Sequence, residues 1–406
     1  MSPSAAAFPP SGRPAGSASP APQVRAAPAS RTPAVLAPIR RKIDRLDAQI
    51  LAWINERLRL VRQIGSLKGQ FDLPLYDPTR EKKIFDRLRR KNRGPLPDEA
   101  LRRIFAELFS TSRNLARPQR IAYLGPSGTF TEQAARQHFG SAPDYMSMPT
   151  IAAVFSDVED DRADYGVTPV ENSSEGVVNH TMDALLKSNL FIVAEESLRV
   201  RLALLSKSSR LDRIREVYSH SHGLAQASQW LARHLPGVRQ HEVASTAAAA
   251  LVVRRHSRAA AIGSEPLASA YGLNILASGI EASRQNRTRF LVLGKSLSPR
   301  SGADRTSLAF YLKDRVGALN RVLRIFSQNR INLTRIESRP ARSSGGLGRA
   351  GIARQRSSVR SPFDYVFFID FAGHIEDPLV RRALAKVRSE CEELRIFGSY
   401  PTNPVS

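Results

Sequence analysis

The 406-residue sequence has a single cysteine, Cys391, and no long apolar run. One cysteine excludes a disulfide within the chain and is typical of proteins in a reducing compartment. No apolar run approaches the roughly 18 residues that a membrane-spanning helix needs, and no apolar segment follows the N-terminal methionine as in a secretory signal. We therefore expect a cytoplasmic protein without a membrane partner.

Acidic residues are also scarce: 37 Asp and Glu stand against 61 Lys and Arg, a formal net charge of +24. A basic excess can indicate nucleic-acid binding. Here the excess is spread along the chain, and part of it falls in residues 1–38 and 341–361, which contain no acid at all. We therefore expect small anionic ligands and no nucleic-acid partner.

The two acid-free segments have compositions that do not build a core. Residues 1–38 are rich in Pro, Ala and Ser with few large apolar residues, which predicts a disordered tail. Their Arg and Ser content also resembles an organellar transit peptide, but the recurring prolines make a poor amphipathic helix. Residues 341–361 form a Gly-, Ser- and Arg-rich stretch that predicts a disordered insertion.

Residues 39–117 have the pattern of an all-α module. Apolar residues recur every three or four positions over residues 39–68, which predicts one long amphipathic helix. Asp77 and Pro78 offer an N-cap and a first helical proline for a second helix, which should end near residue 91 before Gly94. Asp98 opens a third helix, which runs to about residue 115.

Three cations on the long helix suit an anionic ligand. Arg57 and Lys68 are eleven residues apart and lie within about 20° on one helical face, while Arg40 lies roughly 25 Å from Arg57 along the axis. If all three serve one small ligand, Arg40 must come from a second subunit, so the module predicts a homodimer. The alternative is that they are ordinary solvated charges.

Asp77, Arg80 and Glu81 complete the pattern Arg-(x16)-Arg-(x10)-Lys-(x8)-Asp-x-x-Arg-Glu, which resembles the helical chorismate mutases. The resemblance implies an intertwined three-helix dimer that rearranges chorismate to prephenate. It also implies that Arg57 and the Arg40 of a second copy hold the carboxylates and that Lys68 binds the ether oxygen as the catalytic cation. The remaining pocket residues that it implies are Asp77, Glu81, Arg80 and Ser112.

One position departs from the mutase pattern. Four residues after the matched Ser112, the family has Gln or Glu as a second donor to the ether oxygen, and this chain has Ala116. Loss of such a donor typically costs on the order of 10²-fold in rate. Neighbouring Arg117 lies about 100° around the helix, which leaves open whether it substitutes.

Strand and helix patterns alternate through residues 119–297, which predicts an α/β fold with ligands at the carboxyl ends of strands. Polar sequences follow predicted strands: Gly-Pro-Ser-Gly-Thr at 125–129, Glu-Asn-Ser-Ser at 171–174, Ser-His-Ser-His at 219–222 and Ser-Thr at 245–246. Each alone is a typical turn or helix cap. His220 and His222 have no further ligand at metal spacing, so we expect no metal site.

With Asn-Arg-Thr-Arg-Phe at 286–290 entering an apolar strand, this series resembles the prephenate dehydratases. The resemblance implies two α/β lobes similar to type II periplasmic binding proteins, and conversion of prephenate to phenylpyruvate without cofactor. It implies Thr288 as the catalytic donor to the leaving hydroxyl and Arg289 as a carboxylate clamp. The other substrate-binding residues that it implies are Thr129, Glu171, Asn172, Ser173, Ser245, Thr246, Asn286 and Phe290.

Residues 304–402 have a βαββαβ order, the split ferredoxin-like pattern of an α+β domain. This resembles an ACT domain, and it implies feedback inhibition by L-phenylalanine. The matching effector motifs are Gly317, Ala318 and Leu319 at a helix start and Glu337, Ser338 and Arg339 after the second strand. The glycine lets backbone amides approach a carboxylate.

The three modules in this order resemble bacterial bifunctional enzymes of phenylalanine synthesis. A first alternative is a monofunctional dehydratase whose mutase module is weak or only dimerises, because of Ala116. A second is a non-catalytic amino-acid sensor that uses the binding-protein-like cleft. The sequence leaves open whether arogenate is also accepted.

Overall fold

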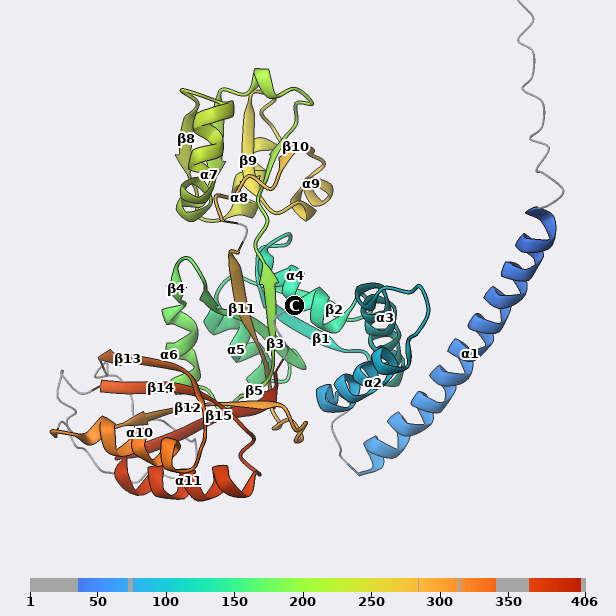
Figure 1. Cartoon of the computed structure of the whole chain (residues 1–406). Helices are drawn as coiled ribbons and strands as arrows, with labels where there is room; N and C mark the ends of the chain where they lie inside the picture. The colour runs from blue at the N-terminus through green and yellow to red at the C-terminus, as the bar shows by residue number, and fades with distance from the viewer. Residues whose placement is uncertain (1–35, 72–75, 284, 313–314, 341–364, 403–406) are drawn as a thin grey trace, which may run out of the picture. The chain divides into compact units, whose positions relative to one another are not determined.

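The computed structural model describes residues 36–71, 76–283, 285–312, 315–340 and 365–402 (Figure 1). The predicted insertion at 341–361 and all but the last three residues of the predicted tail at 1–38 lie outside these ranges. The chain divides into two units, Met1–Glu56 and Arg57–Ser406, with the boundary inside the first helix. Within the described ranges, no helix is both long and apolar enough to cross a bilayer.

Three helices form the N-terminal part: α1 (Leu36–Gln70), α2 (Pro78–Lys91) and α3 (Asp98–Ala116). All three predicted helices are confirmed. α1 begins at Leu36, inside the range that we assigned to the tail, and Pro38 falls in its first turn, where a proline is tolerated. Asp77 is the N-cap of α2, since its side chain accepts a hydrogen bond from the Arg80 amide at 2.8 Å. No residue of α1 is buried, although its apolar residues form a stripe.

The first lobe of the central region is a six-stranded sheet in the order β2-β1-β3-β11-β5, with β4 paired to β3. Its strands are β1 (Arg120–Leu124), β2 (Asp144–Met148), β3 (Tyr165–Asn172), β4 (Gly176–Val177), β5 (Phe191–Arg199) and β11 (Arg287–Gly294). Its helices are α4 (Phe130–Phe139), α5 (Ile151–Glu159) and α6 (Asn179–Lys187). β1 is parallel to β2 and β3, whereas β11 runs antiparallel between β3 and β5. The chain therefore returns from the second lobe into the first sheet, between β3 and the edge strand β5.

The second lobe is a five-stranded sheet in the order β10-β6-β9-β7-β8. Its strands are β6 (Ala203–Ser206), β7 (Glu216–Ser219), β8 (Arg239–Glu242), β9 (Ala259–Gly263) and β10 (Asn274–Ser278). Its helical segments are η1 (Leu211–Arg213), α7 (Ser221–His234), α8 (Thr246–Val253) and α9 (Pro266–Tyr271). The two-lobed α/β prediction is confirmed.

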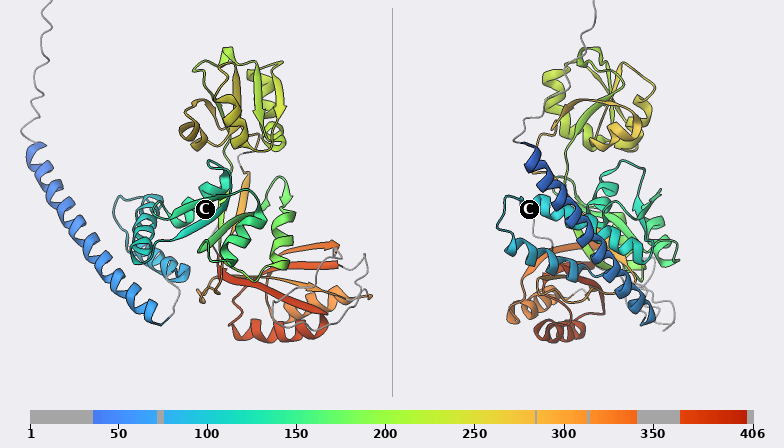
Figure 2. Two further views of the ribbon diagram at one scale, coloured as in Figure 1. Left: turned by 180° about the vertical axis from the view of Figure 1, so that it is seen from behind. Right: turned by 90° about the vertical axis from the view of Figure 1, so that its right-hand side faces the viewer.

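The C-terminal domain has the predicted βαββαβ order. Its elements are β12 (Asp304–Tyr311), α10 (Ala318–Gln328), β13 (Leu333–Pro340), β14 (Tyr365–Ala372), α11 (Pro378–Glu390) and β15 (Glu393–Pro401). The sheet order is β13-β14-β12-β15, and both helices cover one face (Figure 2). Leu308, Phe310 and Ile369 pack beneath these helices. This is the α+β ferredoxin-like domain that the sequence predicted.

The other face of this sheet shares a core with the first lobe. Because side chains alternate along a strand, Ala309 and Phe368 point away from the helices, and they pack in one cluster with Leu291 and Leu293 of β11. β15 also approaches β5 so closely that a Cβ on Gly398 would lie 2.2 Å from the carbonyl oxygen of Ile192. The C-terminal domain therefore packs against the first lobe, which contains β11 and its residue Thr288.

Candidate active site

Strand pairing brings four predicted site residues together. Thr288, the second residue of β11, is in register with Asn172 at the end of β3. Nδ2 of Asn172 donates to Oγ1 of Thr288 at 2.8 Å and to Oδ1 of Asn286 at 3.1 Å. The hydroxyl of Ser173 also donates to Oδ1 of Asn286, at 3.4 Å. All but Ser173 are buried, so these polar groups form one small hydrogen-bonded cluster.

The loop after β3 fixes the orientation of the Asn172 amide. Its Oδ1 accepts hydrogen bonds from the backbone amides of Ser174 at 2.8 Å and Glu175 at 3.2 Å, so Nδ2 faces Thr288. Thr288 therefore acts as an acceptor toward Asn172, and its own hydroxyl hydrogen is left to donate. Nδ2 of Asn286 is buried and has no hydrogen-bond partner among the described residues. The cluster thus holds two donors, the Thr288 hydroxyl and the Asn286 amide, with no acceptor in the ranges that the structure describes.

Three predicted cleft residues lie at helix N-termini. Thr129 caps α4, accepting from the Glu132 amide at 3.4 Å, and Ser245 caps α8, accepting from the Ala248 amide at 3.0 Å. Thr246 is the first residue of α8. Helix N-termini favour anions because their amides and the helix dipole present positive charge. The capping interpretation and the anion-binding interpretation are therefore compatible here.

Phe290 and Glu171 are not part of the Thr288 cluster. Phe290 is buried in the hydrophobic core between β11 and α4, with 1% of its surface exposed. The Glu171 carboxylate lies 3.5 Å from Nε of Arg335 and 3.7 Å from Nη1 of Arg289. Glu171, which pairs with Arg289, faces away from Thr288 because neighbouring residues of a strand point to opposite faces. Phe290, two residues from Thr288, lies on the same face of β11 but packs into the core.

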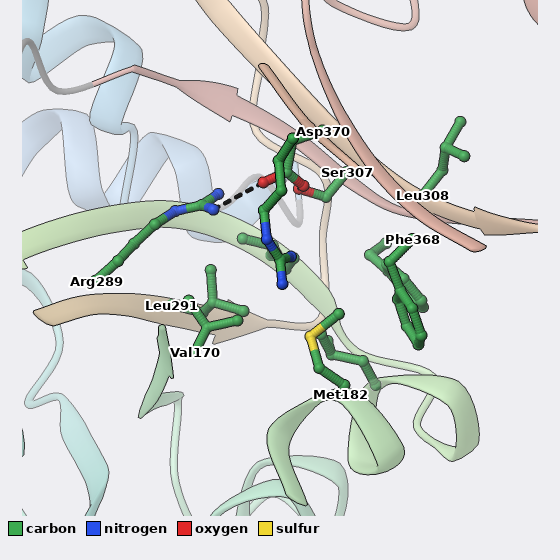
Figure 3. Close-up of a pocket in the computed structure, with 12 residues that line it drawn as sticks. Val170, Met182, Arg289, Leu291, Ser307, Leu308, Phe368 and Asp370 are labelled. Atoms are coloured by element: carbon green, nitrogen blue, oxygen red, sulfur yellow. Dashed lines mark hydrogen bonds and ion pairs between the residues drawn. The ribbon is translucent and has the colours of Figure 1, made fainter. Parts of the chain in front are cut away.

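Arg289, which we expected to clamp a substrate carboxylate, is surrounded by protein groups (Figure 3). Its Nε donates to Glu195 at 2.7 Å, its Nη1 to Asp370 at 2.7 Å and its Nη2 to the Tyr400 hydroxyl at 3.0 Å. Burial by itself lowers the pKa of Arg289, but the electrostatic interactions with Tyr400, Asp370 and Glu195 outweigh it and hold that pKa well above its ordinary value. The guanidinium is therefore a fixed charge that contacts the C-terminal domain.

The predicted mutase residues fall into two groups. Nη1 of Arg57 donates to the Ser112 hydroxyl at 2.7 Å, and its guanidinium lies 5.3 Å from the Phe109 ring centroid. Burial lowers the pKa of Arg57, and the Glu81 carboxylate opposes that shift. Glu81 itself forms an ion pair with the buried Arg113.

The other predicted mutase residues lie on α1 and on α2 with its N-cap. Asp77 serves as the α2 cap, and Arg80 on the same helix is exposed. Lys68 lies two residues before the end of α1, and Arg40 lies on the exposed part of α1 in the other unit. The arrangement of Arg57 and Ser112 is thus present within one chain, while the roles of the remaining residues stay predictions.

Ala116 is the last residue of α3. Its neighbour Arg117 donates to the Asp164 carboxylate at 2.7 Å and belongs to the contact with the first lobe. Because that ion pair already holds the Arg117 guanidinium, the structure offers no argument for Arg117 as the replacement donor.

The predicted effector motifs lie at the edge of the C-terminal sheet. Gly317 is the N-cap of α10 with φ 78°, a left-handed conformation that favours glycine. Ala318 and Leu319 pack against the core under α10. In β13, Ser338 is exposed, whereas Nη2 of Arg339 pairs with Asp183 of α6 at 3.0 Å. Glu337 lies 4.0 Å from Nη2 of Arg335.

Sequence reasoning missed Asp370 and Glu195, the carboxylates that hold Arg289. A signal was present, since Asp370 stands between Ile369 and Phe371 inside an apolar strand. A charge in a buried strand is costly unless it is paired. That rule predicts a partner for Asp370 but not which arginine.

The described residues contain no group of three His, Cys, Asp or Glu side chains arranged to hold a metal ion. His220 caps α7, and Nδ1 of His222 lies 2.5 Å from the Glu175 carboxylate. These histidines therefore have structural contacts at the end of β7.

Comparisons with known proteins agree with this organisation. Residues 39–117 match the family chorismate mutase type II, residues 121–297 match prephenate dehydratase and residues 306–389 match the ACT domain. A bifunctional chorismate mutase/prephenate dehydratase of Aquifex aeolicus is 42% identical over 367 residues, which cover 89% of this chain and 97% of the relative. The Pseudomonas aeruginosa protein of the same name is 39% identical over 369 residues, covering 89% and 96%.

Among solved structures, a prephenate dehydratase from Arthrobacter aurescens in complex with L-Phe is similar, with a TM-score of 0.62 and 31% identity. The similarity covers 71% of this chain and 92% of that one. Three family matches in this order, and relatives matched over nearly their whole length, establish that this chain belongs to the family of bifunctional chorismate mutase/prephenate dehydratases.

Proposed function

We propose that this protein rearranges chorismate to prephenate and converts prephenate to phenylpyruvate, under feedback inhibition by L-phenylalanine. The observation that carries the second activity is the Thr288 hydroxyl, which accepts from Asn172 at 2.8 Å and keeps its own hydrogen for a ligand. Family membership supports the first activity and the regulation.

The dehydratase step mainly requires that the protein orients the substrate and supplies a hydrogen-bond donor to the departing hydroxyl. The bond from the ring to its carboxylate breaks and the carboxylate leaves as carbon dioxide. The electron pair of that bond enters the ring, and the ring hydroxyl leaves, taking up one proton to become water. Aromatisation supplies much of the driving force. We assign Thr288 as the donor to the departing oxygen and Asn286 as a second donor, with α4 and α8 N-termini at Thr129 and Ser245 attracting the anion.

For the mutase step we assign Arg57 to a substrate carboxylate and Lys68 to the ether oxygen. A pericyclic rearrangement uses no nucleophile or base, so a compact conformer and positive charge at the oxygen are what the protein must supply. The Ser112 hydroxyl, 2.7 Å from Nη1 of Arg57, supports this orientation of the guanidinium. The assignment keeps Asp77, Arg80 and Glu81 as pocket residues.

We also propose a homodimer that completes the mutase site. α1 carries exposed apolar residues along its length, among them Ile43, Leu46, Ile50 and Trp53. Arg40 lies roughly 25 Å from Arg57 along the same helix, too far for one small substrate. A second copy that covers this stripe would bring its own Arg40 to the pocket. The location that we propose is the cytoplasm, as the single cysteine and the biosynthetic substrates favour.

The decisive experiment measures phenylpyruvate formation from chorismate and, separately, from prephenate, each with and without L-phenylalanine. Product from both substrates, suppressed by phenylalanine, is the expected result. Thr288→Val should lower prephenate turnover by about 10²- to 10³-fold, and Thr288→Ser should retain most of it. Chorismate consumption by the same variants is the control for folding.

Other outcomes select the alternatives. Product from prephenate alone would favour a dehydratase whose helical module only dimerises, the alternative that Ala116 motivates. No product from either substrate, with phenylalanine still bound, would favour the amino-acid sensor. Arogenate as a third substrate in the same assay tests whether the side-chain carbonyl of prephenate is required.

A further inference from the structure

Six charged side chains meet where the C-terminal sheet rests on the first lobe. Two carboxylates and one guanidinium come from the first lobe, and two guanidiniums and one carboxylate come from the C-terminal domain. In chain order they are Glu171, Glu195, Arg289, Arg305, Arg335 and Asp370. Three positive and three negative charges balance, so the cluster is neutral as a whole.

Arg289 is the centre of this cluster. Its three guanidinium nitrogens are used by Glu195, Asp370 and the Tyr400 hydroxyl, at 2.7, 2.7 and 3.0 Å. Asp370 is held in turn by the Ser307 hydroxyl at 2.6 Å, and Glu195 by Nη1 of Arg305 at 2.6 Å. A guanidinium held in this way is not free to bind a substrate carboxylate.

The same residue is one peptide bond from Thr288. β11 is hydrogen-bonded on both sides, to β3 and β5, and its residues 288–290 pair without interruption with β5. The bulge in the pairing with β3 has its extra residue, Val170, in β3. Thr288 and Arg289 therefore keep the alternation of a regular strand. A displacement of the Arg289 guanidinium therefore reaches the Thr288 hydroxyl through one peptide unit, on the opposite face of the strand.

The other end of the cluster leads to β13, the strand of the predicted effector motif. Arg335 precedes Glu337 by two residues, so both point to the same side of β13. Its Nε lies 3.5 Å from Glu171, which also faces Arg289 at 3.7 Å. Arg335 of β13 is thus connected, through the Glu171 carboxylate, to Arg289 beside Thr288.

The cluster has unused hydrogen-bonding capacity. Nε of Arg305 and Nη2 of Arg335 are buried without a hydrogen-bond partner in the described part of the chain. A cavity lined by Arg289, Arg335 and Asp370, among others, measures about 10 Å³ (Figure 3). That volume is close to the limit for one water. Unsatisfied buried donors are costly, so another arrangement of these ion pairs can be close in free energy.

We propose that Arg289 is a positioning residue, held by Asp370 and Glu195, through which the state of the C-terminal sheet sets the position of Thr288. The proposal rests on the dehydratase activity and phenylalanine inhibition proposed above, and it names the residues that connect them. It implies that Asp370 and Tyr400, which lie in the C-terminal domain, affect catalysis in the first lobe.

The test uses the full-length protein and three variants. Asp370→Asn removes the charge that holds Arg289 and keeps the shape of the side chain. Tyr400→Phe removes only the hydroxyl contact. Arg395→Gln is the matched control, because Arg395 also crosses between the domains, donating to the Leu186 carbonyl of α6 at 2.9 Å. For each we would measure kcat and KM for prephenate, inhibition by saturating L-phenylalanine, and phenylalanine binding by calorimetry.

Asp370→Asn should lower kcat about tenfold or more with KM changed less than about twofold, since misplacement of a catalytic group costs rate more than binding. Phenylalanine should still bind, but inhibition should largely disappear. Tyr400→Phe should lower kcat and weaken inhibition by phenylalanine, each by a smaller factor than Asp370→Asn. It provides the test if Asp370→Asn does not fold. Arg395→Gln should behave as the wild type.

Two results would overturn the proposal. The first is wild-type kcat and full inhibition in both Asp370→Asn and Tyr400→Phe. The second is a raised KM with kcat and inhibition intact, which is the result for a substrate clamp. Failure of the underlying function gives a different observation, namely a wild-type protein that does not turn over prephenate.

Discussion

Asn172→Asp is the sharpest test of the Thr288 assignment. Nδ2 of Asn172 donates to the Thr288 hydroxyl at 2.8 Å, and the two backbone amides that bind Oδ1 fix which end of the amide faces Thr288. The substitution puts an acceptor oxygen where the donor was. The hydroxyl hydrogen of Thr288 then turns toward the carboxylate and is lost to the substrate. Because the side chains have almost the same shape, packing is preserved.

We expect kcat for prephenate to fall by about 10²- to 10³-fold, or about 2.7–4 kcal/mol, because the substitution removes one preorganised donor. The pH dependence of the activity of Asn172→Asp provides an independent test. Burial and the nearby Oδ1 of Asn286 raise the pKa of a carboxyl at this position, whereas hydrogen bonds from the Ser174 and Glu175 amides lower it. When protonated, it can donate to Thr288 as the amide does. Activity relative to wild type should therefore rise as the pH falls through that pKa.

The assay is phenylpyruvate formation from prephenate between about pH 4 and 8, with chorismate consumption as the folding control. Asn172→Ala is the matched comparison, because it removes the donor without capturing the Thr288 hydrogen, so it should lose less activity at pH 7. Near wild-type kcat in Asn172→Asp at pH 7 would refute the argument. So would an equal loss in both variants without any recovery at low pH.

Three further predictions concern the other modules. Ala116→Gln should raise chorismate turnover by about 10²-fold by restoring a donor near the ether oxygen; an unchanged rate in steady-state assays would show that the pocket does not lack one. Gly398→Ala should lower the free energy of unfolding by about 1–3 kcal/mol, because its Cβ would lie 2.2 Å from the backbone oxygen of Ile192; an unchanged thermal midpoint would contradict the close approach. Burial raises the pKa of Asp370, but the charge of Arg289 and the Ser307 hydrogen bond lower it below the ordinary value. The stability that this pair contributes is therefore present above pH 3.8 and lost as the pH falls through the folded pKa. Asp370→Asn should cost about 3–5 kcal/mol at pH 7 and progressively less below pH 3.8 in denaturation curves.

Local signals predicted the elements well. Asp77 followed by Pro78 placed the start of α2 at the observed residue, and the apolar period placed α1 and α3. Short elements such as β2 and α5 were not predicted, since a five-residue strand has too few positions to establish a period. The βαββαβ order of the C-terminal domain followed from alternating strand and helix patterns alone.

The site was only partly predictable. The approach of Asn172, Ser173 and Asn286 to Thr288 depends on β11 entering the sheet beside β3, which strand patterns do not specify. The family resemblance named these residues, but the hydrogen bonds that orient them could be seen only in the structure. The contact of Arg289 with Asp370 could not be predicted either, because an ion pair between distant segments leaves no periodic pattern in the sequence.

One assignment could have been questioned from first principles. Thr288 and Arg289 were both assigned to one substrate, yet consecutive residues of a strand point to opposite faces of the sheet. Either the strand had to be irregular at this point, or one of the two residues had to serve another surface. The structure has the second surface, the C-terminal sheet, because β11 pairs regularly with β5 at Thr288 and Arg289 and the extra residue of the nearby bulge lies in β3.

The opposite orientation of two neighbouring side chains on β11 connects the chemistry to its regulation. With Thr288 on one face of β11 and Arg289 on the other, the strand cannot move toward the C-terminal sheet without carrying the hydroxyl with it. A change in the ion pairs of Arg289 of a few tenths of an ångström would already alter a donor that must lie at hydrogen-bond distance from the departing oxygen. Inhibition would then require no closure of the cleft. It would lower kcat more than it raises KM for prephenate, which distinguishes this route from effectors that block substrate entry.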